Sequence, residues 1–209
     1  MIHISKSIYK TYYFLIALAV ILIPQAFVLP VEYSYENHML ENMEVIILSI
    51  GALNMLYKIN KINVTILKGF YVACSLFYVI MISRELSFGR VFYPIGMDKN
   101  GEQIFMNIHQ IWYGSLVYPL ITILVITAIM LMLNAYKYIR KTGTICLMPK
   151  YSIRLFIIML IFSQVIFEKN IITYLIDYGQ LLEECTEILA YCSLVAFTKD
   201  ITFINKEGF

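Results

Sequence analysis

Ionisable side chains inside apolar stretches are the residues of this sequence that could do chemistry. Glu44, Glu85, Glu184 and Glu187 lie in or at the end of apolar runs, and His109 lies in the longest polar connection. Carboxylates and an imidazole can exchange protons with a substrate, so these five residues are candidate catalytic acid/base groups. Carboxylate oxygens also bind hard divalent cations, and Glu184 with Glu187 would be the ligands of such an ion.

Three basic residues accompany these acids. Arg84, Arg90 and Lys169 are candidate contacts for an anionic group of a substrate. Simpler explanations stay open: Arg84 with Glu85 would be a structural ion pair, Lys169 would extend to the headgroups, and His109 would be an interfacial residue.

Other cofactors have no signature in the sequence. There is no Glu-x-x-His, His-Glu-x-x-His or Gly-x-Ser-x-Gly motif, no nucleotide-binding motif, and three histidines are too few for the usual haem or copper sites. The four cysteines form no CxxC pair. The net charge is only +2, and the basic residues are spread between apolar runs, so nucleic-acid binding has no electrostatic support. A divalent cation is the cofactor that the acids would accept, and the sequence identifies neither a protein partner nor a homo-oligomer.

The elements that must position these groups are membrane-spanning helices. Of the 209 residues, 60% are hydrophobic and 14% charged, and the mean hydropathy of +0.75 is far above that of soluble domains. A helix needs about 20 apolar residues to cross a bilayer, so the lipid bilayer is the predicted environment. The sequence predicts an all-α, polytopic membrane helix bundle in one domain, 1–209, with six helices at about 12–29, 40–57, 64–83, 111–136, 152–167 and 178–197.

The distribution of basic residues predicts the orientation. With the N-terminus inside, twelve of the sixteen Lys and Arg residues are cytoplasmic, whereas only two of the fourteen acids, Asp200 and Glu207, are. Both termini are therefore predicted to be cytoplasmic, and the loop 84–110 to be external. Within that loop, Lys99-Asn-Gly-Glu102 predicts a tight turn between two amphipathic arms.

Counting along the helices predicts that the acids meet at one depth. At about 1.5 Å per residue, Glu44 lies roughly 21 Å above Lys58, and Glu187 roughly 18 Å above Lys199. A charge this deep costs about 2.5–3.5 kcal/mol on insertion scales, so the acids should face the bundle interior, in the outer third of the bilayer. The alternative for Glu41 and Glu44 is the headgroup region, where the N-terminus of a helix stabilises acids. The same alternative applies to Glu183 and Glu184 if the sixth helix begins later than predicted.

A sequence motif at the end of the third predicted helix resembles a family. The stretch Arg84-Glu-Leu-Ser-Phe-Gly-Arg90-Val-Phe92, followed by Asn100-Gly-Glu-Gln and Asn107-Ile-His109, resembles small bacterial inner-membrane proteins of unknown function. Those proteins carry Glu-Glu-Ile-Ser-Trp-Gly-Gln-Arg-Ile-Phe and then an Asn-x-Gln-Gly-Glu…Asn-Leu-His element. Here Arg84 replaces the first Glu, Phe88 the Trp and Arg90 the Gln. The resemblance covers about a third of the chain. It implies a bacterial inner membrane and one layer of polar residues, and it brings no activity.

Two classes of function fit these residues. In the first, an inner-membrane protein with a Glu/Arg/His site binds or processes a lipid-linked or periplasmic substrate. In the second, a non-enzymatic, proton-coupled carrier or a membrane accessory or scaffold subunit uses the same acids to relay protons or to hold the bundle together. The sequence leaves open whether the protein is an enzyme.

Overall fold

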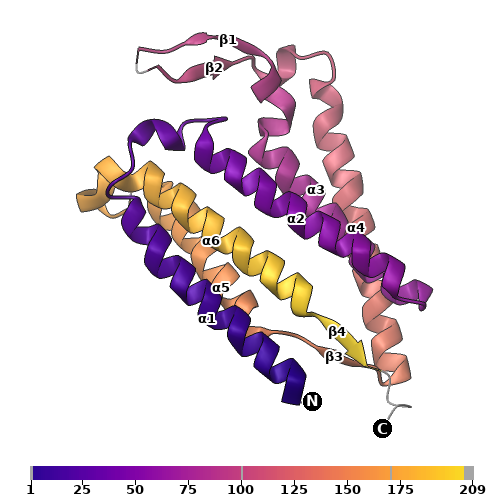
Figure 1. Ribbon diagram of the computed structural model, residues 1–209. Helices are drawn as coiled ribbons and strands as arrows, with labels where there is room; N and C mark the ends of the chain where they lie inside the picture. Colours follow the sequence, from indigo (N-terminus) through magenta and orange to yellow (C-terminus); the bar gives the residue numbers. More distant parts are fainter. Residues whose placement is uncertain (1, 100, 170, 205–209) are drawn as a thin grey trace. The chain divides into compact units, whose positions relative to one another are not determined.

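The computed structural model describes residues 2–99, 101–169 and 171–204 (Figure 1). Most of the described chain is helical. The long helices are α1 (Ile2–Gln25), α2 (Met39–Lys61), α3 (Thr65–Glu85), α4 (Gly114–Thr142), α5 (Lys150–Ile161) and α6 (Gly179–Asp200). The short helices are η1 (Val31–Ser34), η2 (Ser87–Phe92), η3 (Ile108–Gln110) and η5 (Thr173–Tyr178), which are 3₁₀-helices, and the π-helix η4 (Phe162–Phe167). The strands of the described residues are β1 (Pro94–Met97), β2 (Gln103–Phe105), β3 (Ile145–Leu147) and β4 (Thr202–Ile204).

Each of the six predicted helices corresponds to a helix of the structure, with shifted ends. The helix predicted at 12–29 is α1, which begins at Ile2, because hydropathy marks only the apolar part of a helix. The helix predicted at 111–136 is α4, which continues to Thr142, and Gly143 ends it in the left-handed conformation (φ 67°) that glycine adopts without steric cost. The run predicted at 152–167 changes from α to π geometry at Phe162, which hydropathy does not report.

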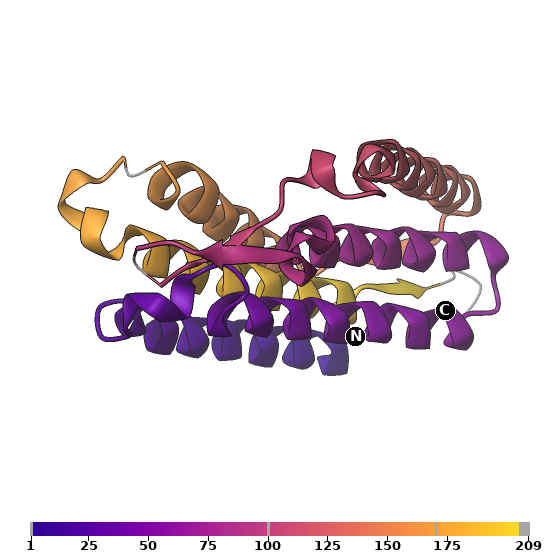
Figure 2. The same cartoon turned by 90° about the horizontal axis from the view of Figure 1, so that it is seen from above.

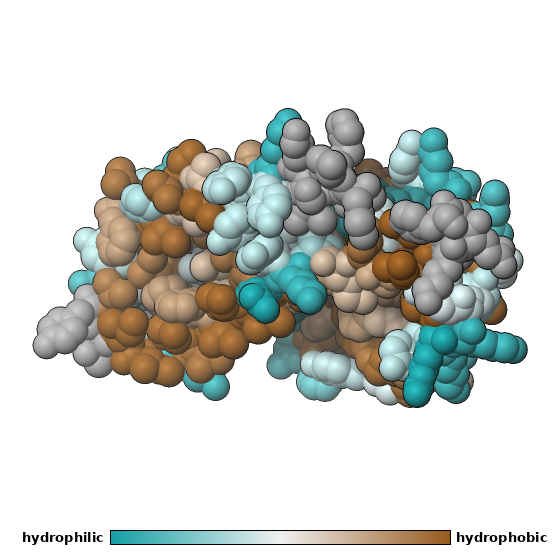
Figure 3. Space-filling view, turned by 90° about the horizontal axis from the view of Figure 1, so that it is seen from below, coloured by the Kyte–Doolittle hydropathy of each residue, from teal (hydrophilic) through white to brown (hydrophobic). Residues whose placement is uncertain are grey.

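Four helical segments of the described chain are long and apolar enough to cross a membrane: Val31–Lys61, Thr65–Glu85, Gly114–Thr142 and Lys150–Phe167. The N-terminal helix adds a shorter apolar stretch, Tyr9–Gln25. Apolar side chains, brown in Figure 3, cover large parts of the visible surface, as expected where lipid replaces water as the solvent. The chain is therefore a helical, multi-pass membrane protein. Six spans and cytoplasmic termini stay predictions.

The described chain divides into two compact units, with the boundary inside α2. Unit 1 consists of the described residues of Met1–Ile47 and Pro149–Asp200, and unit 2 of those of Leu48–Met148 and Ile201–Phe209. In unit 1, α6 packs against both α1 and α5. Its apolar core consists of buried side chains of α1, α2 and α6, together with Ala26, which follows α1. These residues are Leu22, Ala26, Leu40, Leu181, Leu182, Cys185, Ile188 and Leu189.

Unit 2 is organised around the helix pair α3 and α4 (Figure 2). Small residues permit the close approach: Ala128 and Ala135 of α4 are fully buried, and a Cβ added to Gly69 of α3 would lie 3.3 Å from a methyl carbon of Leu131. Helix–helix contacts in membranes favour such small residues, because lipid supplies no hydrophobic driving force between helices.

The segment predicted as the loop 84–110 is largely ordered structure. Arg84 and Glu85 still belong to α3, and strands β1 and β2 pair antiparallel. The turn predicted between the two arms is present: the Glu102 N–H donates to the Asp98 carboxylate at 3.0 Å, and Gly101 adopts φ 85°. Asn100 of that prediction lies outside the described residues.

A second strand pair in unit 2 was not predicted. β3 and β4 pair antiparallel, although one follows α4 and the other ends the described chain. Lys58 Nζ donates to the Ile201 carbonyl at 2.9 Å, and the Tyr71 hydroxyl donates to the same oxygen at 3.3 Å. These hydrogen bonds hold the start of the C-terminal segment to α2 and α3.

Candidate functional site

Glu187 is a buried acid of unit 1. It lies on α6, where Leu181, Leu182, Ile188 and Leu189 pack into the apolar core. The Glu187 side chain is only 3% exposed. Because a helix repeats every 3.6 residues, the residue four positions later, Tyr191, lies on the same face of α6. The apolar packing of α6 therefore fixes both Glu187 and its neighbour.

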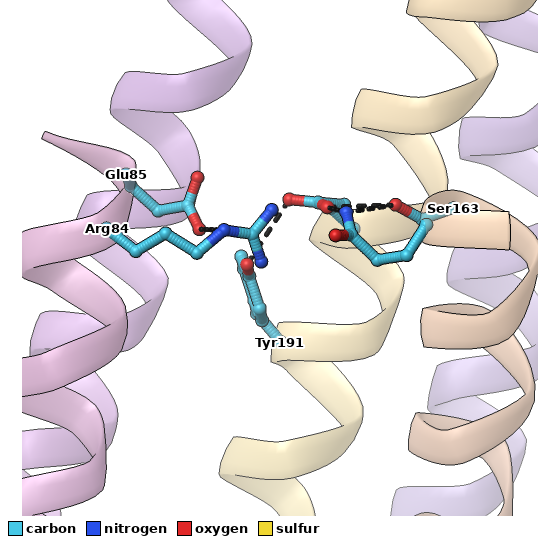
Figure 4. A network of polar contacts seen from close by, with 6 residues as sticks. Arg84, Glu85, Ser163 and Tyr191 are labelled. Carbon is cyan, nitrogen blue, oxygen red and sulfur yellow. Dashed lines mark hydrogen bonds and ion pairs between the residues drawn. The ribbon is translucent and has the colours of Figure 1, made fainter. Parts of the chain in front are cut away.

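Three side chains donate hydrogen bonds to the Glu187 carboxylate. The Ser163 hydroxyl donates to Oε1 at 2.9 Å, Gln164 Nε2 donates to the same oxygen, and the Tyr191 hydroxyl donates to Oε2 at 3.2 Å. Figure 4 labels Ser163 and Tyr191 in this network. Donors on both oxygens stabilise the charged form of a carboxylate.

The π-helix η4 brings two consecutive residues onto one carboxylate. Its hydrogen bond from the Glu168 N–H to the Ser163 carbonyl, 3.0 Å long, joins residues five apart, which defines π geometry. Within this turn Ser163 and Gln164 both reach Glu187, and Gln164 Nε2 also donates to the Ser163 hydroxyl at 3.2 Å. Single π turns inside helices are frequent at functional sites.

Glu44 of α2 is the second acid of this group. It is completely buried (0% exposed), and one of its carboxylate oxygens lies within 4.8 Å of one of Glu187. Helices that are far apart in the sequence therefore bring two carboxylates together in unit 1. Glu41 lies in the first turn of α2, where its carboxylate accepts the Asn37 N–H. The headgroup alternative for these acids stays a prediction.

Two buried carboxylates this close can share a positive charge. Their mutual repulsion is strong at low dielectric, and a proton or small cation held between them relieves it. Hard cations such as Mg²⁺, Mn²⁺ or Ca²⁺ accept carboxylate oxygens, and Glu44 and Glu187 would each supply one. The arrangement also permits acid/base chemistry, because one member can hold the proton that the other lacks.

The other candidates of unit 1 are Glu184 and Lys169. Glu184 is half-buried on α6, three residues before Glu187 and thus on a neighbouring part of the same face. Lys169 is exposed and lies two residues after the end of η4. The exposure of Lys169 agrees with the simpler explanation, a lysine that extends to the headgroups.

The candidates of unit 2 lie at the end of α3 and in the short helices η2 and η3. Arg84 Nε lies 3.8 Å from a Glu85 carboxylate oxygen, with the Arg84 side chain 42% exposed and that of Glu85 6% exposed (Figure 4). Arg90 Nε donates to the Met106 carbonyl at 3.0 Å, which links η2 to the end of the β1–β2 hairpin. His109 is exposed in η3. The predicted roles of Arg84 and Arg90 as anion contacts, and of Glu85 and His109 as acid/base groups, stay predictions.

Sequence reasoning missed Ser163, Gln164 and Tyr191. A signal for the first two was present: Ser163-Gln164 is a polar pair inside the apolar run 152–167. A signal for Tyr191 was its spacing of four residues from Glu187, although most of the 17 tyrosines are expected as interfacial anchors.

Comparison of this chain with models of protein families, with curated proteins and with solved structures finds no match.

Proposed function

We propose that this is a multi-pass protein of a bacterial inner membrane that binds or processes a lipid-linked or periplasmic substrate. Its buried acid/base pair, Glu44 and Glu187, takes up and releases one proton. The inner-membrane location is implied by the sequence resemblance of the segment Arg84–Phe92. The substrate class follows from the predicted position of the acids toward the external face.

The observation that supports this function is the meeting of two buried carboxylates. Glu44 and Glu187 are 0% and 3% exposed, and their oxygens approach within 4.8 Å. Ionisable groups inside membrane proteins are energetically costly, and they mark substrate and ion pathways, proton relays, voltage sensors or ligand counter-ions. A shared proton is the simplest species that this pair could hold.

The hydrogen bonds favour different roles for the two acids. Glu187 accepts from Ser163, Gln164 and Tyr191, and hydrogen bonds are stronger when the acceptor is charged. Glu187 is then the base, and Glu44 is the group that carries the exchangeable proton. Ser163, Gln164 and Tyr191 are positioning residues, since they act by holding Glu187.

Infrared spectroscopy of the protein in lipid nanodiscs tests this proposal, because a protonated carboxyl has its own C=O stretch. The wild type should show a carboxyl band that disappears as the pH is raised, and Glu44→Gln should lose it. Glu168→Gln removes an exposed acid of the same unit and is the matched control, which should leave the band unchanged. A titrating band that persists in both Glu44→Gln and Glu187→Gln would overturn the assignment.

A metal ion is the competing occupant of the pair. Titration of the wild type with Mg²⁺, Mn²⁺ or Ca²⁺ in a calorimeter separates the two cases. For a proton site, the heats of the wild type and of Glu44→Gln should be the same. Saturable binding of one ion that Glu44→Gln abolishes would replace the proton with a metal.

A scaffold role is the second candidate, because the three hydrogen bonds to Glu187 also hold η4 to α6. In that case Glu187→Gln would lower stability and accumulation without any effect on a pH-dependent signal. Proteoliposomes address the remaining alternative, a proton-coupled carrier: a solute-dependent change in internal pH that Glu44→Gln abolishes would favour transport over processing of a substrate.

A further inference from the structure

An apolar groove lies between α3 and α4 in unit 2. Its volume is about 270 Å³. Ile80 and Leu86 line one wall, and Val117, Ile121 and Leu124 line the other. The volume is below the roughly 300–1,000 Å³ of pockets that enclose a drug-sized ligand, so the groove suits one slender chain.

The hydroxyl groups of the groove are directed toward the protein. The Ser83 hydroxyl donates to the Val79 carbonyl at 2.8 Å, and the Tyr113 hydroxyl donates to the Phe88 carbonyl at 3.4 Å. These polar groups are used within unit 2, and the remaining walls are mostly aliphatic. The surface left to an occupant is therefore apolar.

Aromatic residues mark the membrane depth of the upper end of the groove. Tyr113 has ring contacts with both Trp112 and Tyr93, and Phe88 contacts Tyr118. Trp and Tyr gather at the membrane–water interface, where their polar atoms meet the headgroups. The ends of α3 and α4 that carry this aromatic cluster are therefore placed at an interface, and the groove begins there.

The length of the groove matches one leaflet. Val117 and Leu124 lie three and ten residues beyond Gly114, the first residue of α4, which places them roughly 4.5 and 15 Å along the helix axis. Half of a hydrocarbon core is about 15 Å thick. The groove thus extends from the interface to the middle of the bilayer, the region that lipid acyl chains fill.

From the volume, the apolar lining, the aromatic rim and the length, we propose that this groove binds one acyl chain of a membrane lipid. The inference uses residues of unit 2 only and is independent of the proton function proposed for Glu44 and Glu187. Recognition is of the chain, since the groove offers apolar contacts and its hydroxyls are used internally.

Native mass spectrometry in dodecyl maltoside tests the proposal after incubation with dioleoyl-phosphatidylethanolamine or dioleoyl-phosphatidylglycerol. The wild type should retain one lipid per chain, with similar retention of the two headgroups because their chains are identical. Val117→Trp, which fills the groove, should reduce the retained fraction about tenfold, a difference of roughly 1.4 kcal/mol in binding. Ile123→Trp is the matched control, because Ile123 is 60% exposed on the same helix and does not line the groove.

Three results would overturn the proposal: no lipid retained by the wild type, equal retention by Val117→Trp, or retention of only one of the two headgroups. A wild-type dimer that Val117→Trp dissociates would also overturn it, because a second copy would then occupy the groove. If Val117→Trp does not accumulate, Leu124→Phe fills the deep end with a smaller side chain and carries the same expectation.

Discussion

Helix α6 of unit 1 and helix α4 of unit 2 bury their residues in opposite ways. Of the four segments that are long and apolar enough to cross a membrane, α4 is the most apolar. Only 6% of its apolar 18-residue stretch is buried within the protein. α6 carries four acids, and most of its residues are buried, among them Glu187, Thr186 and Ser193. Hydropathy and burial are thus inversely related in these two helices.

The solvent explains this inversion. In water the apolar helix would be the buried one, but lipid solvates apolar side chains as well as a protein core does. Polar groups have no partners in lipid, so they are placed against other protein groups. The contrast extends to the two units: unit 1 holds a network of buried polar side chains around Glu187 beside its apolar core, and unit 2 depends on close helix contacts and on tight turns at glycines.

Replacement of Glu187 should give the largest effect and tests the contrast directly. In Glu187→Ala the donors Ser163, Gln164 and Tyr191 lose their shared acceptor. Each buried donor left unsatisfied costs about 1–3 kcal/mol, so a loss of roughly 3 kcal/mol or more in unfolding free energy is expected. Circular dichroism during unfolding by SDS in mixed micelles measures it.

The matched control is Ile123→Ala on α4. Ile123 is 60% exposed to the surroundings, so lipid or detergent replaces the lost contacts and the change should stay within about 0.5 kcal/mol. Equal losses of unfolding free energy in Glu187→Ala and Ile123→Ala would mean that the buried polar contacts of α6 stabilise the protein no more than an exposed apolar side chain of α4 does.

The turn after α3 gives the next largest expected effect. Gly89 has φ 88°, and a Cβ there would collide with the Tyr113 hydroxyl oxygen. The left-handed conformation costs a non-glycine residue about 1–2 kcal/mol, and the collision adds to it, so Gly89→Ala should destabilise the protein by roughly 2 kcal/mol. The same SDS titration measures this loss.

Gly101→Ala separates conformational strain from collision. Gly101 has nearly the same φ, 85°, but a Cβ there meets nothing within 4 Å. This variant should therefore show only the strain, about 1 kcal/mol. If Gly101→Ala and Gly89→Ala lose the same stability, the contact with Tyr113 contributes nothing to unit 2.

Hydropathy predicted the helices of both units but not their internal organisation. Apolar runs report where lipid can solvate a helix, and six of them located α1 to α6. The change to π geometry at Phe162 accompanies hydrogen bonds from Ser163 and Gln164 to Glu187, a residue of another helix, so no local pattern specifies it. The β3–β4 pair depends on contacts between segments that are far apart in the sequence, so local hydropathy does not predict it either.

The acids of the candidate site were predictable from the sequence, but the side chains that donate hydrogen bonds to them were not. A carboxylate in a predicted span is conspicuous because burial without partners is costly, so Glu44 and Glu187 were identified from the sequence. Serine, glutamine and tyrosine are tolerated in apolar helices at much lower cost. Ser163, Gln164 and Tyr191 became recognisable only through their hydrogen bonds to Glu187.

A smaller effect is expected where α2 meets α3 inside unit 2. A Cβ on Gly51 would lie 2.5 Å from Cζ of Tyr78, a side chain that is 1% exposed. Gly51→Ala gains about 1 kcal/mol in helix propensity, but overpacking a buried contact costs about 1–3 kcal/mol. The net expectation is a loss of roughly 1 kcal/mol in SDS unfolding.

Gly69→Ala is the control for that substitution. A Cβ on Gly69 meets only one methyl carbon of Leu131 at 3.3 Å, which can move aside, so the gain in helix propensity should remain. Stabilisation by both substitutions would show that the α2–α3 contact in unit 2 has room that the structure does not indicate.

The smallest effect concerns a thiol outside the apolar helices. Burial raises the pKa of Cys146 in β3, because desolvation disfavours the thiolate. At any pH below the raised pKa, the folded protein should contain less thiolate than free glutathione does.

A variant with Cys74, Cys185 and Cys192 replaced by alanine should therefore react slowly with maleimide near pH 8. Its rate should continue to rise at pH values where the rate of glutathione has levelled off. SDS-unfolded protein is the control and should match glutathione, whereas a folded protein that already matches it would show that the β3–β4 pair of unit 2 does not shield this thiol.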